Sequence, residues 1–572
     1  MDAGMLNKKL EKLCKKSKVV GVNVALFDSN GMIYNYNYGF ANKEKRIKSD
    51  NDSLYMIGSN TKVMTALGIL KLLEEGKLSL DDDIRKFIPE FEVKSNVTVQ
   101  NSSNCERSEQ LQSNFEYDKI TIENLLMHRS GLVSDLFHLI LDRTRDYHEV
   151  IGEVRDTYLT AKPGKMYSYS NVGYTLLGIV IERVSGVPYT KYIQNEIANP
   201  LGIEVHFLLN EADRRPYTSC VSLCYDKKGK AVEDLLSTLL PAGSNTYMSL
   251  NDFVKFGQIF LDKNNRFLKK ETLEFMETLN VEESIDKDLQ NVGYGLIHNH
   301  YDFGEKVGKV LGHGGNTSCH HSIFNYIPDL GIGIVVMTNS EQAVGLLGVV
   351  VNTVLVEYLK EKGISLQKVS LKQKYVQRDG KEVVGRYATG LGLIDIRLNS
   401  KNQLITKVSK IPIKLQPCED GYLQCCSIKL LHKLPPFKRS ILAMRLKFAS
   451  YSGEDIMIME QSGKYHKTRG IIGCKYEQTA ISESFKEACG DYRVSNEHFK
   501  DIYCKCCLKV EGDALMLEIE ALNVKLNSCL KVIDENLAVI QGFGRLAKQT
   551  VEVQKKEEGD YLIFSGVVFK KM

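Results

Sequence analysis

The sequence predicts a mixed α/β (α+β) domain, with an antiparallel sheet flanked by helices, followed by one or two all-β barrel modules. Within residues 1–362, apolar-rich runs typical of strands lie near both ends, and helical patterns lie between them. After residue 381, short runs of alternating apolar residues replace the helical patterns. The length of 572 residues agrees, because about 100–200 residues per domain predicts three or four domains.

The N-terminal domain is expected to open with a helix and then an antiparallel pair of strands. Residues 19–27 and 32–40 flank a Ser-Asn-Gly turn, in which Gly31 supplies the backbone freedom of a hairpin. A buried helix is predicted over residues 59–75 because apolar residues wrap most of its surface. Gly76 then ends this helix.

The remaining elements of this domain follow from the same patterns. Helical patterns lie at residues 122–127, 172–184, 250–261 and 342–360. Residues 318–326 and 332–337 predict a second hairpin, and we expect the strands from both ends to form one sheet. Residues 94–114 are polar and rich in serine and asparagine, which predicts an inserted surface loop.

The C-terminal part is interpreted as two related modules. A basic, polar stretch at residues 363–381 is the predicted linker. Gly-Arg-Tyr at 385–387 and Gly-Asp-Tyr at 490–492 each precede a pair of short strand patterns, so the halves resemble copies about 105 residues apart. Each half suits an eight-stranded barrel or sandwich that hides its sheet edges, which predicts modules at 382–480 and 481–572.

Composition and charge narrow the class of partner. Hydrophobic residues make up 43% and charged residues 26%, as in ordinary globular proteins. The 75 lysines and arginines nearly balance the 71 acidic residues, which argues against a nucleic-acid partner. We expect a small-molecule or short-peptide substrate and no cofactor, and the sequence gives no basis for predicting the oligomeric state.

The sequence also bears on location. The most apolar stretch, residues 343–356, is interrupted by glycines and polar residues and is interpreted as a buried helix rather than a membrane span. The charged N-terminus lacks the apolar core and cleavage site of a secretory signal. Fourteen cysteines, some adjacent, favour a reducing compartment over a disulfide framework. We therefore expect a cytoplasmic protein whose cysteines are mostly buried.

The first motif that could carry chemistry is Ser-Asn-Thr-Lys at residues 59–62, where the buried helix begins. Ser59 could simply cap this helix. A serine nucleophile, however, needs a base, and Lys62 lies one helical turn away on the same face. Burial of this lysine by apolar neighbours such as Met56, Ile57 and Leu67 would lower its pKa toward a useful range.

Two further motifs follow. Tyr169 and Asn171 precede the helix predicted from residue 172, where they could merely pack and cap it. In catalysis, the phenol could relay a proton, and the amide could hold a substrate carbonyl or orient the lysine. The third motif, His-Gly-Gly-Asn at 313–316, is either a glycine turn or a strand edge where substrate lies and a backbone N–H stabilises an oxyanion.

In this order, the three motifs resemble the serine β-lactamase and penicillin-binding-protein superfamily, and the nearest branch is class C-like. The resemblance runs from about residue 10 to residue 358 and includes LKLLEEGKLSLDDDIRKFIPEF at 70–91, LLMHRSGL at 125–132 and YSYSNVGYTLLG at 167–178. It implies that Ser59 is the acylated nucleophile. It also implies that Lys62 and Tyr169 share the acid and base work, with either one as the base, and that Asn171 binds substrate.

The same resemblance assigns the third motif to substrate binding, with one departure. His313, Gly314 and Gly315 would form the far wall of the site, and the N–H groups of Ser59 and Asn316 would form the oxyanion hole. Relatives that hydrolyse penicillins or cell-wall peptides usually carry Lys-Thr-Gly here, so a permanent ammonium suited to a substrate carboxylate is missing. We therefore expect turnover of esters or D-amino-acid amides above that of β-lactams.

The His-x-Gly form is similar to that of D-aminopeptidases and some esterases of this superfamily. D-Aminopeptidases also carry two C-terminal eight-stranded, lipocalin-like barrels, which the repeated tail resembles. An aminopeptidase needs an anion for the substrate's amine, and the sequence identifies none. The predicted function is thus a serine hydrolase that forms an acyl-enzyme on an amide or ester of a small substrate. The alternative is a non-catalytic penicillin-binding-like sensor or peptide-binding protein.

Other candidate residues are assigned structural roles. Cys504, Cys506 and Cys507 lack the two-plus-two spacing of a structural zinc site, so we predict no metal there. We expect His320 and His321 to be strand residues rather than part of the cleft, and His128 to hold its loop by hydrogen bonds.

Overall fold

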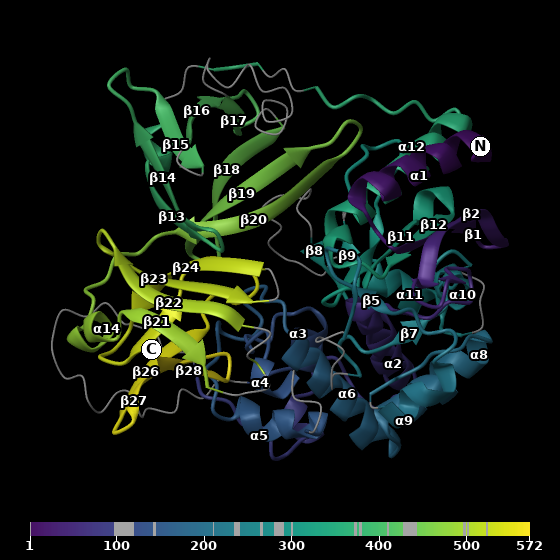
Figure 1. The fold of residues 1–572 in the computed structure, drawn as a ribbon, viewed down its shortest axis with the longest axis horizontal. Coiled ribbons are helices and arrows are strands. Elements are labelled where there is room, and N and C mark those ends of the chain that lie inside the picture. Colours follow the sequence, from purple (N-terminus) through teal and green to yellow (C-terminus); the bar gives the residue numbers. More distant parts are fainter. Residues whose placement is uncertain are drawn as a thin grey trace.

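The computed structural model comprises an N-terminal mixed α/β domain and two β-barrels (Figure 1). It describes residues 2–95, 119–140, 145–209, 211–233, 241–262, 267–278, 291–298, 301–370, 374–376, 380–408, 411–426, 443–495, 499, 503–521 and 524–572. From residue 96 onward, the loop predicted at 94–114 lies outside the described residues.

The N-terminal domain is built on an antiparallel sheet with the order β3-β2-β1-β12-β11-β10-β9-β8. β1 pairs with β2 on one side and with β12 on the other, so the two ends of the domain meet inside the sheet, as predicted. The strands are β1 (Gly21–Asp28), β2 (Gly31–Asn42), β3 (Ile47–Lys48), β8 (Asn291–Val292), β9 (Ile297–His298), β10 (Leu311–Asn316), β11 (His321–Ile327) and β12 (Ile332–Thr338).

Helices cover both faces of this sheet because its central strands are apolar on both faces. On β1, Val22, Val24 and Leu26 pack in the cluster of α1 and α12, whereas Ala25 and Phe27 pack in the cluster of α2, α6 and α10. The helices are α1 (Ala3–Ser17), α2 (Thr61–Glu74), α3 (Ile122–Leu126), α4 (Phe137–Ile140), α5 (Val150–Val154), α6 (Asn171–Ser185), α7 (Tyr189–Ile193), α8 (Asn199–Leu201), α9 (Glu211–Arg214), α10 (Leu250–Gln258), α11 (Lys270–Met276) and α12 (Val344–Glu361).

Helix α12 contains the most apolar stretch of the sequence. Among the described residues, the segment Glu341–Glu361 is long and apolar enough to cross a membrane by composition. Its side chains Val350, Val354 and Leu359 are buried against β11, β12 and α1. The stretch therefore serves as a core helix, as the sequence predicted.

The C-terminal part forms two closed barrels of eight strands each, which confirms the predicted repeat. Closure pairs the first strand of each barrel with its last, which removes exposed sheet edges. The first barrel contains β13 (Gly385–Thr389), β14 (Gly392–Leu398), β15 (Leu404–Val408), β16 (Ile411–Pro417), β17 (Leu423–Cys426), β18 (Met444–Tyr451), β19 (Glu454–Ser462) and β20 (Lys467–Lys475).

The second barrel follows a short helix, α14 (Glu483–Glu487), and lies beside α4 and α5 of the N-terminal domain (Figure 1). Its strands are β21 (Gly490–Val494), β22 (Tyr503–Glu511), β23 (Ala514–Ala521), β24 (Val524–Val532), β25 (Leu537–Ile540), β26 (Thr550–Lys556), β27 (Gly559–Phe564) and β28 (Val567–Lys571). The strands of both barrels fall within the predicted modules 382–480 and 481–572.

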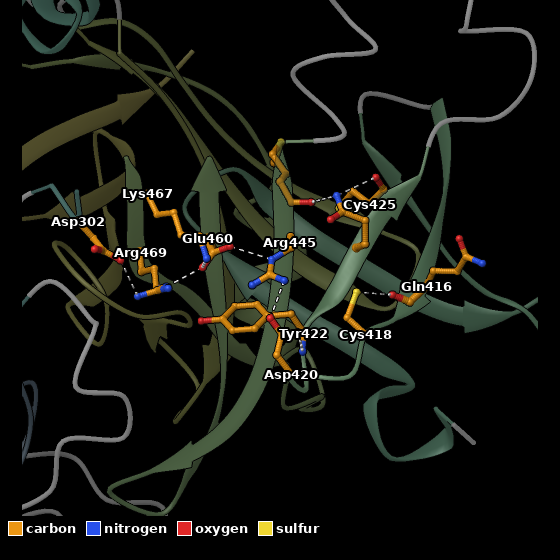
Figure 2. Close-up of polar contacts among 12 residues, drawn as sticks. Asp302, Gln416, Cys418, Asp420, Tyr422, Cys425, Arg445, Glu460, Lys467 and Arg469 are labelled. Carbon is orange, nitrogen blue, oxygen red and sulfur yellow. Dashed lines mark hydrogen bonds and ion pairs between the residues drawn. The ribbon is translucent and has the colours of Figure 1, made fainter. Parts of the chain in front are cut away.

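A buried charge cluster joins the first barrel to the N-terminal domain (Figure 2). Glu460 on β19 is 1% exposed and accepts hydrogen bonds from Nε of Arg445 and Nε of Arg469, at 2.8 and 2.7 Å. The guanidinium of Arg469 is also 3.5 Å from Asp302 of the N-terminal domain. Backbone hydrogen bonds between Asp302 and Lys467 run in both directions beside this cluster. The cluster thus fixes where the first barrel docks.

Two local expectations require correction. Ser170, not Asn171, caps α6, because the Ser170 hydroxyl accepts from the N–H of Gly173. The His-Gly-Gly-Asn motif is not a turn, since it forms most of β10, and the next strand begins only at His321. The two central glycines obscure the alternation of apolar and polar side chains by which a strand is recognised.

Candidate active site

Ser59 lies on a tight turn that the sheet holds in place. It occupies a 3-10 turn, Gly58–Asn60, immediately before α2. Gly58 adopts φ of 56°, which glycine tolerates best. The hydroxyl of Ser322 on β11 donates to the carbonyl of Ile57 at 2.6 Å and accepts from the amide of Asn60 at 2.8 Å. These contacts fix the turn against the sheet, while Ser59 itself is half-buried.

Lys62 is the second residue of α2, and its side chain points back toward Ser59. Its side chain is 0% exposed, and its amine is 3.2 Å from the Ser59 hydroxyl. The amine also donates to the side-chain oxygen of Asn171 at 2.6 Å and to the carbonyl of Gly243 at 2.7 Å. Burial, followed by the positive charge of Arg545, places the pKa of Lys62 well below 10.5, although the negative charge of Asp135 raises it. The amine is therefore suited to accept a proton.

Tyr169 lies close to both Lys62 and Ser59. Its ring centroid is 5.0 Å from the Lys62 amine. Burial raises the pKa of Tyr169 to about 12, against the lowering effects of its hydrogen bond with Ser59 and of the Arg545 charge. At neutral pH this phenol keeps its proton and is suited to donate it.

His128 supports the tyrosine and has a structural role. Its ring centroid lies 4.3 Å from that of Tyr169, and its Nδ1 accepts from the backbone N–H of Ser170 at 3.0 Å. Burial, followed by the charges of Lys62 and His313, lowers the pKa of His128 well below 6.5. A neutral imidazole that accepts this bond holds the tyrosine loop, as the sequence predicted.

Asn171 connects Lys62 to an ion pair between a buried carboxylate, Asp135, and an exposed arginine, Arg545. Its side-chain nitrogen donates to Oδ1 of Asp135 at 2.7 Å, while its oxygen accepts from Lys62. Asp135 is 1% exposed, and its Oδ2 accepts from Nε and Nη2 of Arg545 at 2.8 and 2.7 Å. Both ends of the Asn171 amide are thus engaged, which favours orientation of the lysine over direct substrate contact.

The third motif, on β10, packs against the turn that carries Ser59. A β-carbon on Gly58 would be 2.8 Å from the backbone nitrogen of Asn316, and one on Gly315 would be 1.8 Å from the carbonyl oxygen of Ile57. Glycine at both positions therefore lets β10 approach the Ser59 turn. His313 is buried, and its Nδ1 is 2.6 Å from the carbonyl of Gly314.

The three predicted motifs thus meet around one serine. His320 and His321 are both buried. His321 is the first residue of β11, as predicted, and contacts the side chain of Asn316, whereas His320 lies just before this strand and packs beside Tyr55. Sequence reasoning missed Asp135 and Arg545. Asp135 follows the LLMHRSGL segment and could have been suspected, whereas nothing near Arg545 indicates that a barrel loop reaches this site.

The fold and the three motifs define the class of serine β-lactamases and penicillin-binding proteins. The chain belongs to the beta-lactamase family, whose model matches residues 6–347 and whose members are typically serine hydrolases. The match ends within α12 and leaves both barrels outside it.

Similar proteins support the same grouping. Protein flp of Staphylococcus aureus (strain N315) is 33% identical over 198 residues, which cover 34% of this chain and 36% of that protein. A putative D-alanyl-D-alanine carboxypeptidase of Escherichia coli (strain K12) is 29% identical over 208 residues, or 33% of this chain and 43% of that protein. The matched part therefore spans well under half the length of these relatives.

Two solved structures share the fold. An octameric penicillin-binding protein homologue from Pyrococcus abyssi superimposes with a TM-score of 0.52 at 22% identity, covering 100% of both chains. SurE superimposes with a TM-score of 0.56 at 21% identity, covering 82% of this chain and 99% of that one. At these identities the likeness concerns the fold alone.

Proposed function

We propose that this protein is a serine hydrolase that cleaves an amide or ester bond of a small substrate through an acyl-enzyme on Ser59. One observation carries the proposal. The amine of Lys62 is fully buried, is held by Asn171 and Gly243, and lies 3.2 Å from the Ser59 hydroxyl. A structural lysine would not need a hydroxyl neighbour, whereas a serine nucleophile requires such a base.

The directions of the two pKa shifts favour one division of labour. Lys62, with a lowered pKa, takes the Ser59 proton as Oγ bonds to the substrate carbonyl carbon and the carbonyl electrons move onto oxygen. The N–H groups of Ser59 and Asn316 stabilise that oxyanion. As the carbonyl reforms, the bond to the leaving group breaks, and Tyr169 gives the leaving group its proton and regains one from Lys62. Water then attacks the carbonyl carbon of this ester, the bond from that carbon to Ser59 Oγ breaks as the acid product leaves, and the proton lost by the water passes to Oγ.

The substrate is proposed to be an ester or a D-amino-acid amide or peptide rather than a β-lactam. The third motif offers a buried histidine instead of a lysine ammonium for a substrate carboxylate. Two similar proteins point to D-amino acids: one is named a putative D-alanyl-D-alanine carboxypeptidase, and SurE was solved with D-Leu. Asp135 is not assigned to a substrate amine, because it is buried and already holds Arg545 and Asn171.

Active-site labelling tests the proposal. The full-length protein is incubated with a fluorophosphonate probe, and the modified peptide is identified by mass spectrometry. We expect modification of Ser59 in the wild type and none in Ser59→Ala. Ser322→Ala is not a suitable control because Ser322 supports the turn, so Ser400→Ala, which alters an exposed serine between β14 and β15, serves instead. Absence of Ser59 labelling from pH 6 to about pH 10, where a lowered lysine pKa would permit it, would refute the mechanism.

A substrate comparison tests the specificity. Nitrocefin, p-nitrophenyl acetate and D-alanine p-nitroanilide are compared at equal enzyme concentration. We expect ester or D-amide turnover to exceed nitrocefin turnover, and the reverse ranking would show that His313 does not decide specificity. An adduct that forms but never turns over, with no hydrolysis of any substrate, would instead favour the non-catalytic sensor.

A further inference from the structure

The second barrel contributes a charged residue to the N-terminal site. Arg545 lies on the loop of residues 541–549 between β25 and β26, 410 positions after its partner Asp135. Its guanidinium carbon is 6.0 Å from the ring centroid of Tyr169. The arginine side chain is 51% exposed, whereas the Asp135 side chain is 1% exposed, so the loop delivers a cation to a carboxylate buried at the mouth of the site.

The loop that carries Arg545 is held at several points. Gln549 donates to the hydroxyl of Ser134, next to Asp135, at 2.7 Å. Lys548 pairs with Glu454 of the first barrel at 2.9 Å. Leu546 and Lys548 adopt positive φ angles of 71° and 64°, which non-glycine residues keep only where their surroundings impose them. Contacts with all three parts of the molecule therefore define the position of Arg545.

We propose that Arg545 is a positioning residue of the active site, acting through Asp135 and Asn171 to hold the Lys62 amine against Ser59. This inference rests on the proposed serine-hydrolase function and deepens it. Four links carry it: Arg545 to Asp135 at 2.7 and 2.8 Å, Asp135 to Asn171 at 2.7 Å, Asn171 to Lys62 at 2.6 Å, and Lys62 to Ser59 at 3.2 Å. The catalytic apparatus would then be complete only when the second barrel is docked.

The buried charge of Asp135 explains why an arginine is needed beside it. A buried carboxylate without a partner would be costly, and it would attract a proton to Lys62. Arg545 cancels that charge, so the amine keeps a lowered pKa. Among the described residues, the titratable and charged groups that contact or act on Lys62 are Tyr169, Tyr174, His128, Asp135 and Arg545, with His313 beside His128 and Tyr167 beside Arg545. Among these, Asp135 and Arg545 can be altered without touching Ser59 or Lys62.

The test measures the rate of Ser59 labelling by a fluorophosphonate between pH 5 and pH 10 in full-length variants. On the acid side of the profile, the midpoint is the pH at which the labelling rate falls to half its maximum. Arg545→Gln should raise this midpoint by about one pH unit, because more of Lys62 is protonated. Labelling below the midpoint should therefore be about tenfold slower. Asp135→Asn should move the midpoint downward. The double variant should return it toward the wild-type value, and Arg545→Lys, which keeps the charge, should move it least.

Matched controls separate this role from packing. Arg493→Gln alters an exposed arginine on β21 and should leave the profile unchanged. If Arg545→Gln fails to fold, the downward shift in Asp135→Asn and its reversal in the double variant carry the test. Midpoints that coincide with that of the wild type, even with an overall loss of rate, would overturn the positioning role and leave the proposed function intact. A wild type that is never labelled would overturn both.

Discussion

The amine of Lys62 donates to the side-chain oxygen of Asn171 across 109 positions of sequence, at 2.6 Å. This bond joins the helix that follows the nucleophile, α2, to the first residue of α6. It fixes the direction of the amine, while burial weakens its hold on a proton. The relationship therefore determines both the geometry and the protonation state of the proposed base, and two predictions depend on it.

Replacing Lys62 with methionine should abolish the reactivity of Ser59. Lys62→Met keeps most of the side-chain volume but removes the proton acceptor, and loss of a general base typically costs about 10²–10⁴-fold in rate. The measurement is the second-order rate of fluorophosphonate labelling at pH 8. The matched control is Lys71→Met, on the same helix near its C-terminal end, where the amine lies 3.6 Å from Glu196. Equal rates in Lys62→Met and wild type would exclude the lysine as base.

The wild-type pH profile should rise on the acid side and stay level into the alkaline range. The base must be neutral, so activity is lost as pH falls through the lowered pKa of Lys62. The acid must keep its proton, and the pKa of Tyr169 is about 12, so no loss from this group is expected below about pH 11. Hydrolysis of a p-nitrophenyl ester, corrected for spontaneous hydrolysis, gives the profile. An activity maximum near pH 6 with a fall by pH 8 would contradict these assignments.

The two glycines of the third motif should differ in their tolerance of a side chain. A β-carbon at Gly315 would lie 1.8 Å from the Ile57 carbonyl oxygen, which cannot move without displacing the Ser59 turn. Gly315→Ala should therefore destabilise the N-terminal domain by about 2 kcal/mol and abolish labelling of Ser59. At Gly314 the nearest atom, the Ser322 carbonyl oxygen, would be 3.9 Å away, so Gly314→Ala should melt like the wild type. Thermal unfolding of both variants provides the comparison.

Local patterns made most of the fold and the three motifs of the site predictable. Apolar periodicity identified α2, α6, α10 and α12, because each buries a long apolar face, and the repeated tail identified the barrels. The sequence could not decide between a glycine turn and a strand edge for the motif in β10, because its glycines leave no alternation of side chains. The contribution of Arg545 could not be predicted, since it arises from how the second barrel docks and not from any pattern near Arg545.

A mutation in the buried charge cluster of the first barrel should destabilise the protein more than a mutation in an exposed ion pair on the same barrel. Burial opposes the charge of Glu460, but the cations Lys467, Arg445 and Arg469 hold its pKa below the ordinary value. Stability from this group is therefore present above the unfolded-state pKa and is lost as pH falls through the folded-state pKa.

Glu460→Gln leaves two buried arginines without this counter-charge, and it should cost about 3 kcal/mol and make the first barrel less sensitive to acid. The exposed pair of Asp455 and Lys475, 3.4 Å apart, supplies the control, because Asp455→Asn should cost about 1 kcal/mol or less. Urea denaturation at pH 7 and pH 4 gives the free energy of unfolding of both variants. Hydrogen exchange in β18, β19 and β20 then shows whether the loss lies in the first barrel. Equal destabilisation by the two substitutions would show that Glu460 does not hold the first barrel against the N-terminal domain.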